Sequence, residues 1–114
     1  MNVTQLQIHY NDLSGEIPSE IGEMLNLEKI EIHMTNITGG IPASICSLTQ
    51  LELLSIGDNP NMAGTIPNCI GDLQSMGHMD FYRNGLTGEI PTGICNLSNI
   101  SSIDSNGING LCTL

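Results

Sequence analysis

Positive charge is nearly absent from this chain of 114 residues. Lys29 and Arg83 are its only basic residues apart from three histidines, against twelve Asp and Glu, and the formal net charge is -10. Such a surface repels phosphate backbones and anionic lipid head groups. The composition therefore argues against nucleic acid or a membrane surface as a partner and favours a basic patch on a protein or peptide.

Long apolar stretches are missing as well. No run of apolar residues approaches the roughly 18 that a membrane span requires, so we expect no insertion into a bilayer. Residues 1–10 alternate polar and apolar side chains and lack the charged start and apolar block of a signal peptide. Two explanations stay open at this point: the sequence lacks the protein's natural beginning, or the protein stays in the cytosol.

The sequence is instead dominated by one pattern, Gly-x-Ile-Pro, which occurs four times. Its prolines stand at positions 18, 42, 67 and 91, so the steps are 24, 25 and 24 residues. A fixed period of this length is the signature of a solenoid, in which each repeat stacks on the next. We predict a single domain over residues 1–114, with full repeats near 3–26, 27–50, 51–75 and 76–99 and a degenerate fifth over 100–114.

Each repeat shows two spacings that predict its local structure. An apolar pair two residues apart lies on one face of a short strand, and a second pair, three residues apart after the proline, suits a 3₁₀ turn. The strand pairs are Leu6 and Ile8, Ile30 and Ile32, Leu54 and Ile56, and Met79 and Phe81. Asn11, Asn59 and Asn84, with Thr35 in the same position, follow the strands, and we interpret them as inward side chains that bond the backbone there.

This frame, together with the following Ile-[Gly/Cys]-x-Leu, resembles the plant-type leucine-rich repeat (LRR) from Val3 to about Ile103. The resemblance is to a fragment or minimal member without the usual cysteine caps. It implies an α/β repeat solenoid: a right-handed horseshoe with a concave parallel β-sheet, convex 3₁₀ turns and often a second short sheet. It also implies a non-enzymatic module that recognises a protein or peptide through its concave strands, as in receptor-like ectodomains or inhibitors of secreted hydrolases.

The predicted register stacks the variable strand positions into a grid on the concave face. Because neighbouring strands lie ~4.8 Å apart, His9 and His33 become near neighbours beside Glu31. Two imidazoles and a carboxylate are able to bind a divalent metal or to form a pH-sensitive patch, but solvent-facing histidines are the favoured interpretation, and we predict no metal and no cofactor. The predicted ligand-binding residues are Glu31, His33, His78, Asp80, Tyr82 and Arg83.

Catalytic constellations are not apparent. No nucleophile stands beside an activating partner, and Asp80 and Asp104 lie one repeat apart on an open face, without the burial that tunes a general acid. The sequence therefore predicts a protein that is not an enzyme.

Four cysteines and four glycosylation sequons bear on the compartment. Cys46, Cys69 and Cys95 are predicted to be small buried thiols of the convex turns, while a Cys95–Cys112 disulfide closing the last turn is the alternative. The sequons place predicted glycans at Asn2, Asn36, Asn96 and Asn99 and favour an extracellular or cell-surface location over the cytoplasm. A rival function is a structural segment that associates end to end through uncapped repeats.

Overall fold

The computed structural model describes residues 2–10, 12–97 and 102–104. Five parallel strands form one sheet in the order β1-β3-β5-β6-β7, and two shorter strands form a second parallel sheet, β2-β4. The strands of the larger sheet are β1 (Gln5–His9), β3 (Lys29–His33), β5 (Leu53–Gly57), β6 (His78–Asp80) and β7 (Ser102–Asp104). The remaining elements are β2 (Ser14–Glu16), β4 (Asn36–Thr38) and the 3₁₀ helices η1 (Ser19–Glu23), η2 (Ala43–Ser47), η3 (Asn68–Asp72) and η4 (Thr92–Asn96).

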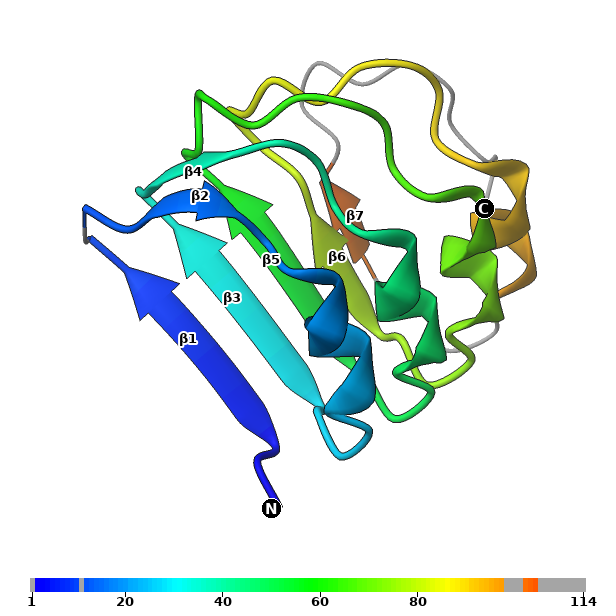
Figure 1. The fold of residues 1–114 in the computed structure, drawn as a ribbon. Helices are drawn as coiled ribbons and strands as arrows, with labels where there is room; N and C mark the ends of the chain where they lie inside the picture. The colour runs from blue at the N-terminus through cyan, green and yellow to red at the C-terminus, as the bar shows by residue number, and fades with distance from the viewer. Residues whose placement is uncertain (1, 11, 98–101, 105–114) are drawn as a thin grey trace.

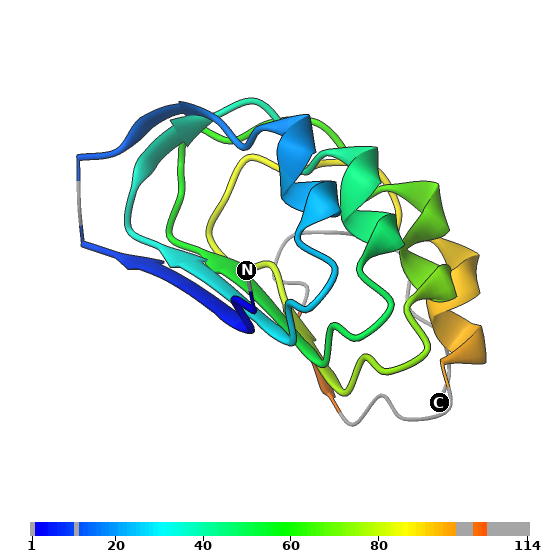
Figure 2. The ribbon, with the colours of Figure 1, turned by 60° about the horizontal axis from the view of Figure 1, so that its bottom comes forward.

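These elements wind into a solenoid with two walls. Figure 1 shows the larger sheet on one side and the row of 3₁₀ helices on the other, with β2 and β4 along the path between them. In Figure 2 the successive turns of the chain stack behind one another, each with the same outline. The predicted LRR solenoid, with its parallel sheet, 3₁₀ turns and second short sheet, is confirmed.

The strand register agrees with the predicted grid. Gln7 pairs with Glu31, Glu31 with Ser55, and Ser55 with Asp80. The neighbouring columns follow the same steps, since His9 pairs with His33 and His33 with Gly57. Side chains two residues apart on a strand therefore share the concave face across four repeats.

The core lies between the two walls and is made from the apolar positions of each repeat. Leu54 and Ile56 of β5 are fully buried, as are Met79 and the chain's only phenylalanine, Phe81. The asparagine column is confirmed where it is described. Asn59, also fully buried, donates from Nδ2 to the Ile32 carbonyl (2.8 Å) and accepts from the Thr35 amide (3.0 Å) and hydroxyl (2.7 Å), whereas Asn11 lies outside the described residues.

A residue that follows each of the strands β1, β3, β5 and β6 adopts a left-handed backbone. Tyr10, Met34, Asp58 and Arg83 have φ between 49° and 56°, a conformation that is uncommon for residues other than glycine. The amide of each of the first three donates to a carbonyl of the next repeat, as Tyr10 does to His33 (3.2 Å). These contacts hold the turn in place and line up the four residues along one rim of the concave sheet.

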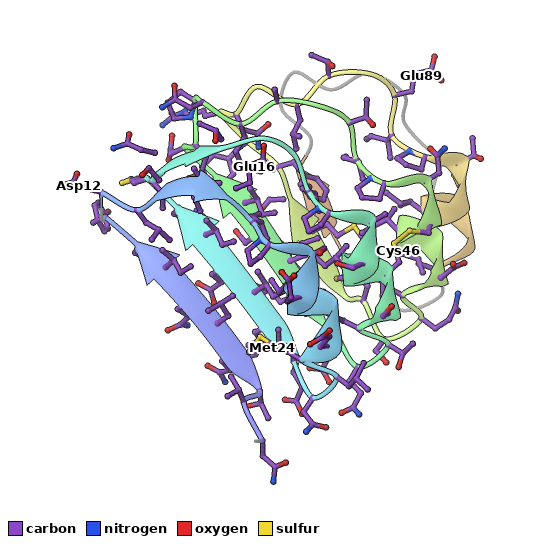
Figure 3. The ribbon with its side chains drawn as sticks, viewed as in Figure 1. Asp12, Glu16, Met24, Cys46 and Glu89 are labelled. Atoms are coloured by element: carbon purple, nitrogen blue, oxygen red, sulfur yellow. A yellow bond between two sulfur atoms is a disulfide. The ribbon has the colours of Figure 1, made fainter. Side chains whose placement is uncertain are left out.

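The cysteines differ from the prediction of buried free thiols. Cys46 of η2 and Cys69 of η3 form a disulfide with 5.9 Å between their Cα atoms, which appears as the sulfur–sulfur bond beside Cys46 in Figure 3. Adjacent 3₁₀ helices lie side by side. Cys46, which follows the buried Ile45, therefore reaches Cys69, which precedes the buried Ile70 of the next repeat. Cys95 is also disulfide-bonded, but Cys112 lies outside the described residues, and the Cys95–Cys112 pairing stays a prediction.

Candidate binding surface on the concave sheet

His33 is the centre of the polar network on the concave face. Its Nε2 lies 3.0 Å from the Ser55 hydroxyl and its Nδ1 lies 3.0 Å from the Tyr82 hydroxyl. Because Ser55 donates its proton to Asp80 (2.9 Å), the serine oxygen accepts from Nε2–H of His33. The Tyr82 hydroxyl then donates to Nδ1, and this network assigns one neutral tautomer to His33.

Asp80 continues the network to the next histidine. Its Oδ1 accepts from Ser55, while its Oδ2 lies 2.7 Å from Nε2 of His78. An unbroken line of hydrogen bonds thus runs from Tyr82 through His33, Ser55 and Asp80 to His78, across strands β3, β5 and β6. The bonds of His33 and Ser55 join neighbouring strands, whereas His78 bonds Asp80 of its own strand β6.

Three aromatic rings stand in a row on the same face. The His9 and His33 rings are stacked, with centroids 5.0 Å apart, and the His33 and Tyr82 rings are tilted, with centroids 5.8 Å apart. Tyr82 occupies the space above Gly57, where a Cβ atom would overlap the phenol ring. Glycine in the row therefore allows Tyr82 to lean across β5 and reach His33.

Burial and nearby charge keep the central pair neutral. Burial, followed by repulsion from His9, lowers the pKa of His33 from its ordinary 6.5, and this outweighs the carboxylates of Asp80, Glu31 and Asp58. Burial, followed by the same Asp58 and Asp80 charges, raises the pKa of Tyr82 above 10.0 although Arg83 opposes the shift. Both side chains are therefore uncharged hydrogen-bonding groups at neutral pH.

The remaining predicted residues lie at the margins of this network. Glu31 accepts from the Gln7 amide (3.3 Å) and lies 3.6 Å from Nε2 of His9. Arg83 lies 3.5 Å from Asp58 on the exposed rim; an exposed pair of this kind contributes little to stability. Glu31 thus borders the aromatic row at His9, and the Arg83–Asp58 pair borders it near Tyr82.

The structure brings four of the six predicted site residues, His33, His78, Asp80 and Tyr82, into direct connection. Glu31 joins them through His9, and Arg83 stands beside Tyr82 at the rim. Sequence reasoning missed Ser55, Gly57 and Asp58. The sequence signal for these three residues was their place in the same columns as the predicted residues. Small side chains such as those of Ser55 and Gly57 leave room for larger neighbours to make contacts across a strand.

Ser55 lies between two partners of the network, since its hydroxyl donates to Asp80 and accepts from His33. Among the residues that the structure describes, no three His, Cys, Asp or Glu side chains converge to hold a metal ion. Over the same residues, every helix is too short or too polar to cross a membrane.

Two of the four predicted glycosylation residues can be located. Asn2 and Asn36 are exposed, Asn36 at the start of β4 and Asn2 with its Oδ1 accepting from Asn26 (3.2 Å). The side chain of Asn96 and the whole of Asn99 lie outside the described part of the chain. All four modifications stay predictions.

The fold is a repeat solenoid with a polar hydrogen-bonded network on its concave sheet. The Leucine Rich Repeat family model matches residues 2–24, 26–48 and 75–97. The chain belongs to the leucine-rich repeat family. A comparison with curated proteins found no match.

Solved plant structures share this fold closely. The chain is 32% identical to a plant peptide hormone receptor, RGFR1, in complex with RGF2, with a TM-score of 0.89 over 95% of this chain and 17% of the receptor chain. It is 29% identical to the Arabidopsis receptor kinase HAESA in complex with the peptide hormone IDA and the co-receptor SERK1, with a TM-score of 0.88 over 96% and 18% of the two chains. A plant ice-binding protein is 28% identical, with a TM-score of 0.85 over 95% and 35%. The chain therefore spans about a sixth of the length of the receptors.

Proposed function

We propose that this protein is a non-enzymatic module that recognises a protein or peptide through its concave sheet. The observation that carries the proposal is the cross-strand network from Tyr82 to His78, with the stacked His9 and His33 rings beside it. A rigid row of aromatic and hydrogen-bonding groups loses little entropy on binding. The likeness to receptors solved with peptide hormones supports the same function.

The partner surface that fits this site is basic. Glu31, Asp58 and Asp80 lie around the aromatic row, and the chain as a whole carries a net charge of -10. Complementary charge accelerates association and is screened by salt. Affinity for the partner should therefore fall as ionic strength rises, mainly through a slower association rate.

An extracellular or cell-surface location agrees with this function. The Cys46–Cys69 disulfide is of a kind that persists in oxidising compartments and is rare in the cytosol. Intact mass of the protein made from its natural gene, before and after deglycosylation and reduction, tests the location. Glycan on Asn36 with oxidised cysteines supports it, whereas an unmodified, fully reduced chain contradicts it.

A random-peptide display selection tests the binding function directly. Peptides selected on the wild-type chain are measured by calorimetry against Tyr82→Ala and Arg83→Ala. Gln50→Ala, an exposed change in the turn between η2 and β5, is the control. We expect Tyr82→Ala to weaken binding by more than tenfold, because it removes the hydroxyl on His33 and the ring above Gly57. Unchanged affinity in both site variants would show that the concave site is wrongly assigned.

A further inference from the structure

The hydrogen bonds around His33 run in one direction at neutral pH. As a carboxylate, Asp80 only accepts, so Ser55 donates to it (2.9 Å) and the serine oxygen accepts from Nε2–H of His33 (3.0 Å). A neutral imidazole has one N–H, so Nδ1 carries no proton and accepts from the Tyr82 hydroxyl (3.0 Å). This chain of bonds crosses β3, β5 and β6, which lie side by side in Figure 1. Each of its protons points toward Asp80.

Protonation of His33 reverses one of these bonds and leaves the others in place. The imidazolium carries a proton on both ring nitrogens. Its Nε2–H still donates to Ser55, whereas its Nδ1–H now donates to the Tyr82 oxygen, and the phenol proton has to turn away from His33. The Tyr82 hydroxyl therefore offers a lone pair to its surroundings when His33 is neutral and an O–H donor when His33 is charged. Both side chains are only partly buried, so a ligand is able to meet this change.

Charged and titratable groups face His33 from every strand around it. His9 of β1 is stacked on its ring, Glu31 belongs to its own strand, Asp58 follows β5 and Asp80 belongs to β6. Burial, followed by His9, lowers the pKa of His33 below 6.5 against the pull of the three carboxylates. The imidazole is therefore neutral at neutral pH and gains its proton in mild acid.

Tyr82 keeps its proton throughout this range. Burial, followed by the charges of Asp58 and Asp80, raises the pKa of Tyr82 above 10.0, with a smaller contribution from Tyr10 and with Arg83 opposing the shift. A phenol proton is thus always present to be turned, and the charge of the pair changes at the imidazole alone.

We propose that His33 and Tyr82 form a proton-operated relay that changes with pH what the concave site recognises. The proposal rests on the proposed function, because it takes the concave face as the place where a peptide binds. With His33 neutral, the Tyr82 oxygen accepts from the ammonium or guanidinium group of a basic peptide. With His33 charged, the same hydroxyl donates instead, and the imidazolium opposes the positive ligand. Basic ligands are therefore held at neutral pH and released in acid.

The tautomer of His33 tests the relay without any ligand. ¹⁵N NMR of the full chain between about pH 8 and pH 5 separates protonated from bare ring nitrogens. We expect Nε2–H with a bare Nδ1 at the upper end and two protonated nitrogens at the lower end. Ser55→Ala removes the acceptor of Nε2–H and should allow both neutral tautomers, while Ser47→Ala, an exposed change on η2, should keep one. A neutral wild-type His33 with its proton on Nδ1 overturns the relay, as does a single tautomer in Ser55→Ala.

Peptide binding tests the consequence for recognition. The probes are peptides selected at neutral pH from a display library that lacks His, Asp and Glu, so that they do not titrate in this range. We expect their affinity for the wild-type chain to fall about tenfold between about pH 7.5 and pH 5. His33→Gln keeps a donor for Ser55 and an acceptor for Tyr82 but gains no proton, so most of this fall should disappear. His78→Gln removes an imidazole outside the relay and should retain it.

The relay and the binding function fail in different ways. If the selected peptides lose no affinity in Tyr82→Ala, the concave site is wrong, and recognition by the relay is wrong with it even if the tautomer is as expected. If the peptides bind at Tyr82 but His33→Gln shows the same loss in acid as the wild type, the relay is wrong and the binding function stands.

Discussion

The first repeat and the third repeat carry the same apolar pattern in opposite surroundings. Leu54 and Ile56 of the third repeat are fully buried, whereas Leu6 and Ile8 at the equivalent positions of the first are only partly covered. All four large apolar side chains described as exposed belong to residues 10–34: Tyr10, Leu13, Leu25 and Met34. A repeat therefore buries its core only when neighbours stack on both sides of it, and the pattern alone does not supply them.

The two repeats also differ in how they are tied to their neighbours. The disulfide from Cys46 to Cys69 joins η2 to η3, whereas η1 contains no cysteine and cannot form a disulfide to η2. Cys69 belongs to the repeat that holds the extra residue near Pro60 and Asn61, and Cys46 belongs to the repeat before it. The disulfide holds the convex helices together where the repeat length changes from 24 to 25 residues.

Truncating equivalent leucines should give the largest contrast between the repeats. Leu54→Ala leaves a cavity between two stacked repeats and should lower the free energy of unfolding by about 2–5 kcal/mol. Leu6→Ala, at a position open to water, should cost about 1 kcal/mol or less. Urea unfolding at low protein concentration measures both, and equal losses would contradict the difference in burial between the two sites.

Removing the disulfide should have the next largest effect. The double variant Cys46→Ala, Cys69→Ala releases a loop closed over 23 residues and should lower the stability by roughly 3 kcal/mol, chiefly by enlarging the unfolded ensemble. Ser47→Ala, an exposed change on η2, is the control. Hydrogen exchange should show faster opening of η2 and η3, while uniform acceleration including β1 would contradict a local role for the disulfide.

Acidification should have the smallest effect on stability. It tests His33, the inner histidine of the stacked pair, against His9, the outer one. The pKa of His33 is lowered in the folded state from 6.5, so the unfolded chain binds more protons between these two values. The His33 contribution to stability is therefore lost as the pH falls below 6.5 and is constant above it. Thermal unfolding between pH 7 and 5 should show this loss in the wild type and a smaller one in His33→Gln.

His9→Gln provides the matched control for that titration. It removes the outer imidazole whose charge lowers the pKa of His33, so the pKa of His33, followed by NMR, should rise toward its ordinary value. A fall in that pKa would show that stacking, rather than repulsion, dominates the pair.

The fold shared with a plant ice-binding protein shows how little the solenoid itself says about function. That protein and the hormone receptors match the chain with similar identity and TM-scores. The concave side chains therefore carry the functional argument. Their columns were predictable, because the period of 24 or 25 residues places equivalent positions of successive repeats in register. Their contacts were not predictable.

By itself the sequence determined the repeat period, the parallel register, the 3₁₀ turns and the asparagine column, because each depends on local spacing repeated along the chain. Tertiary structure decided the Cys46–Cys69 bond, the lean of Tyr82 across Gly57 to His33, and the exposure of the first repeat. These features depend on which side chains of different repeats meet. Stacking in space decides this, whereas spacing along the chain does not.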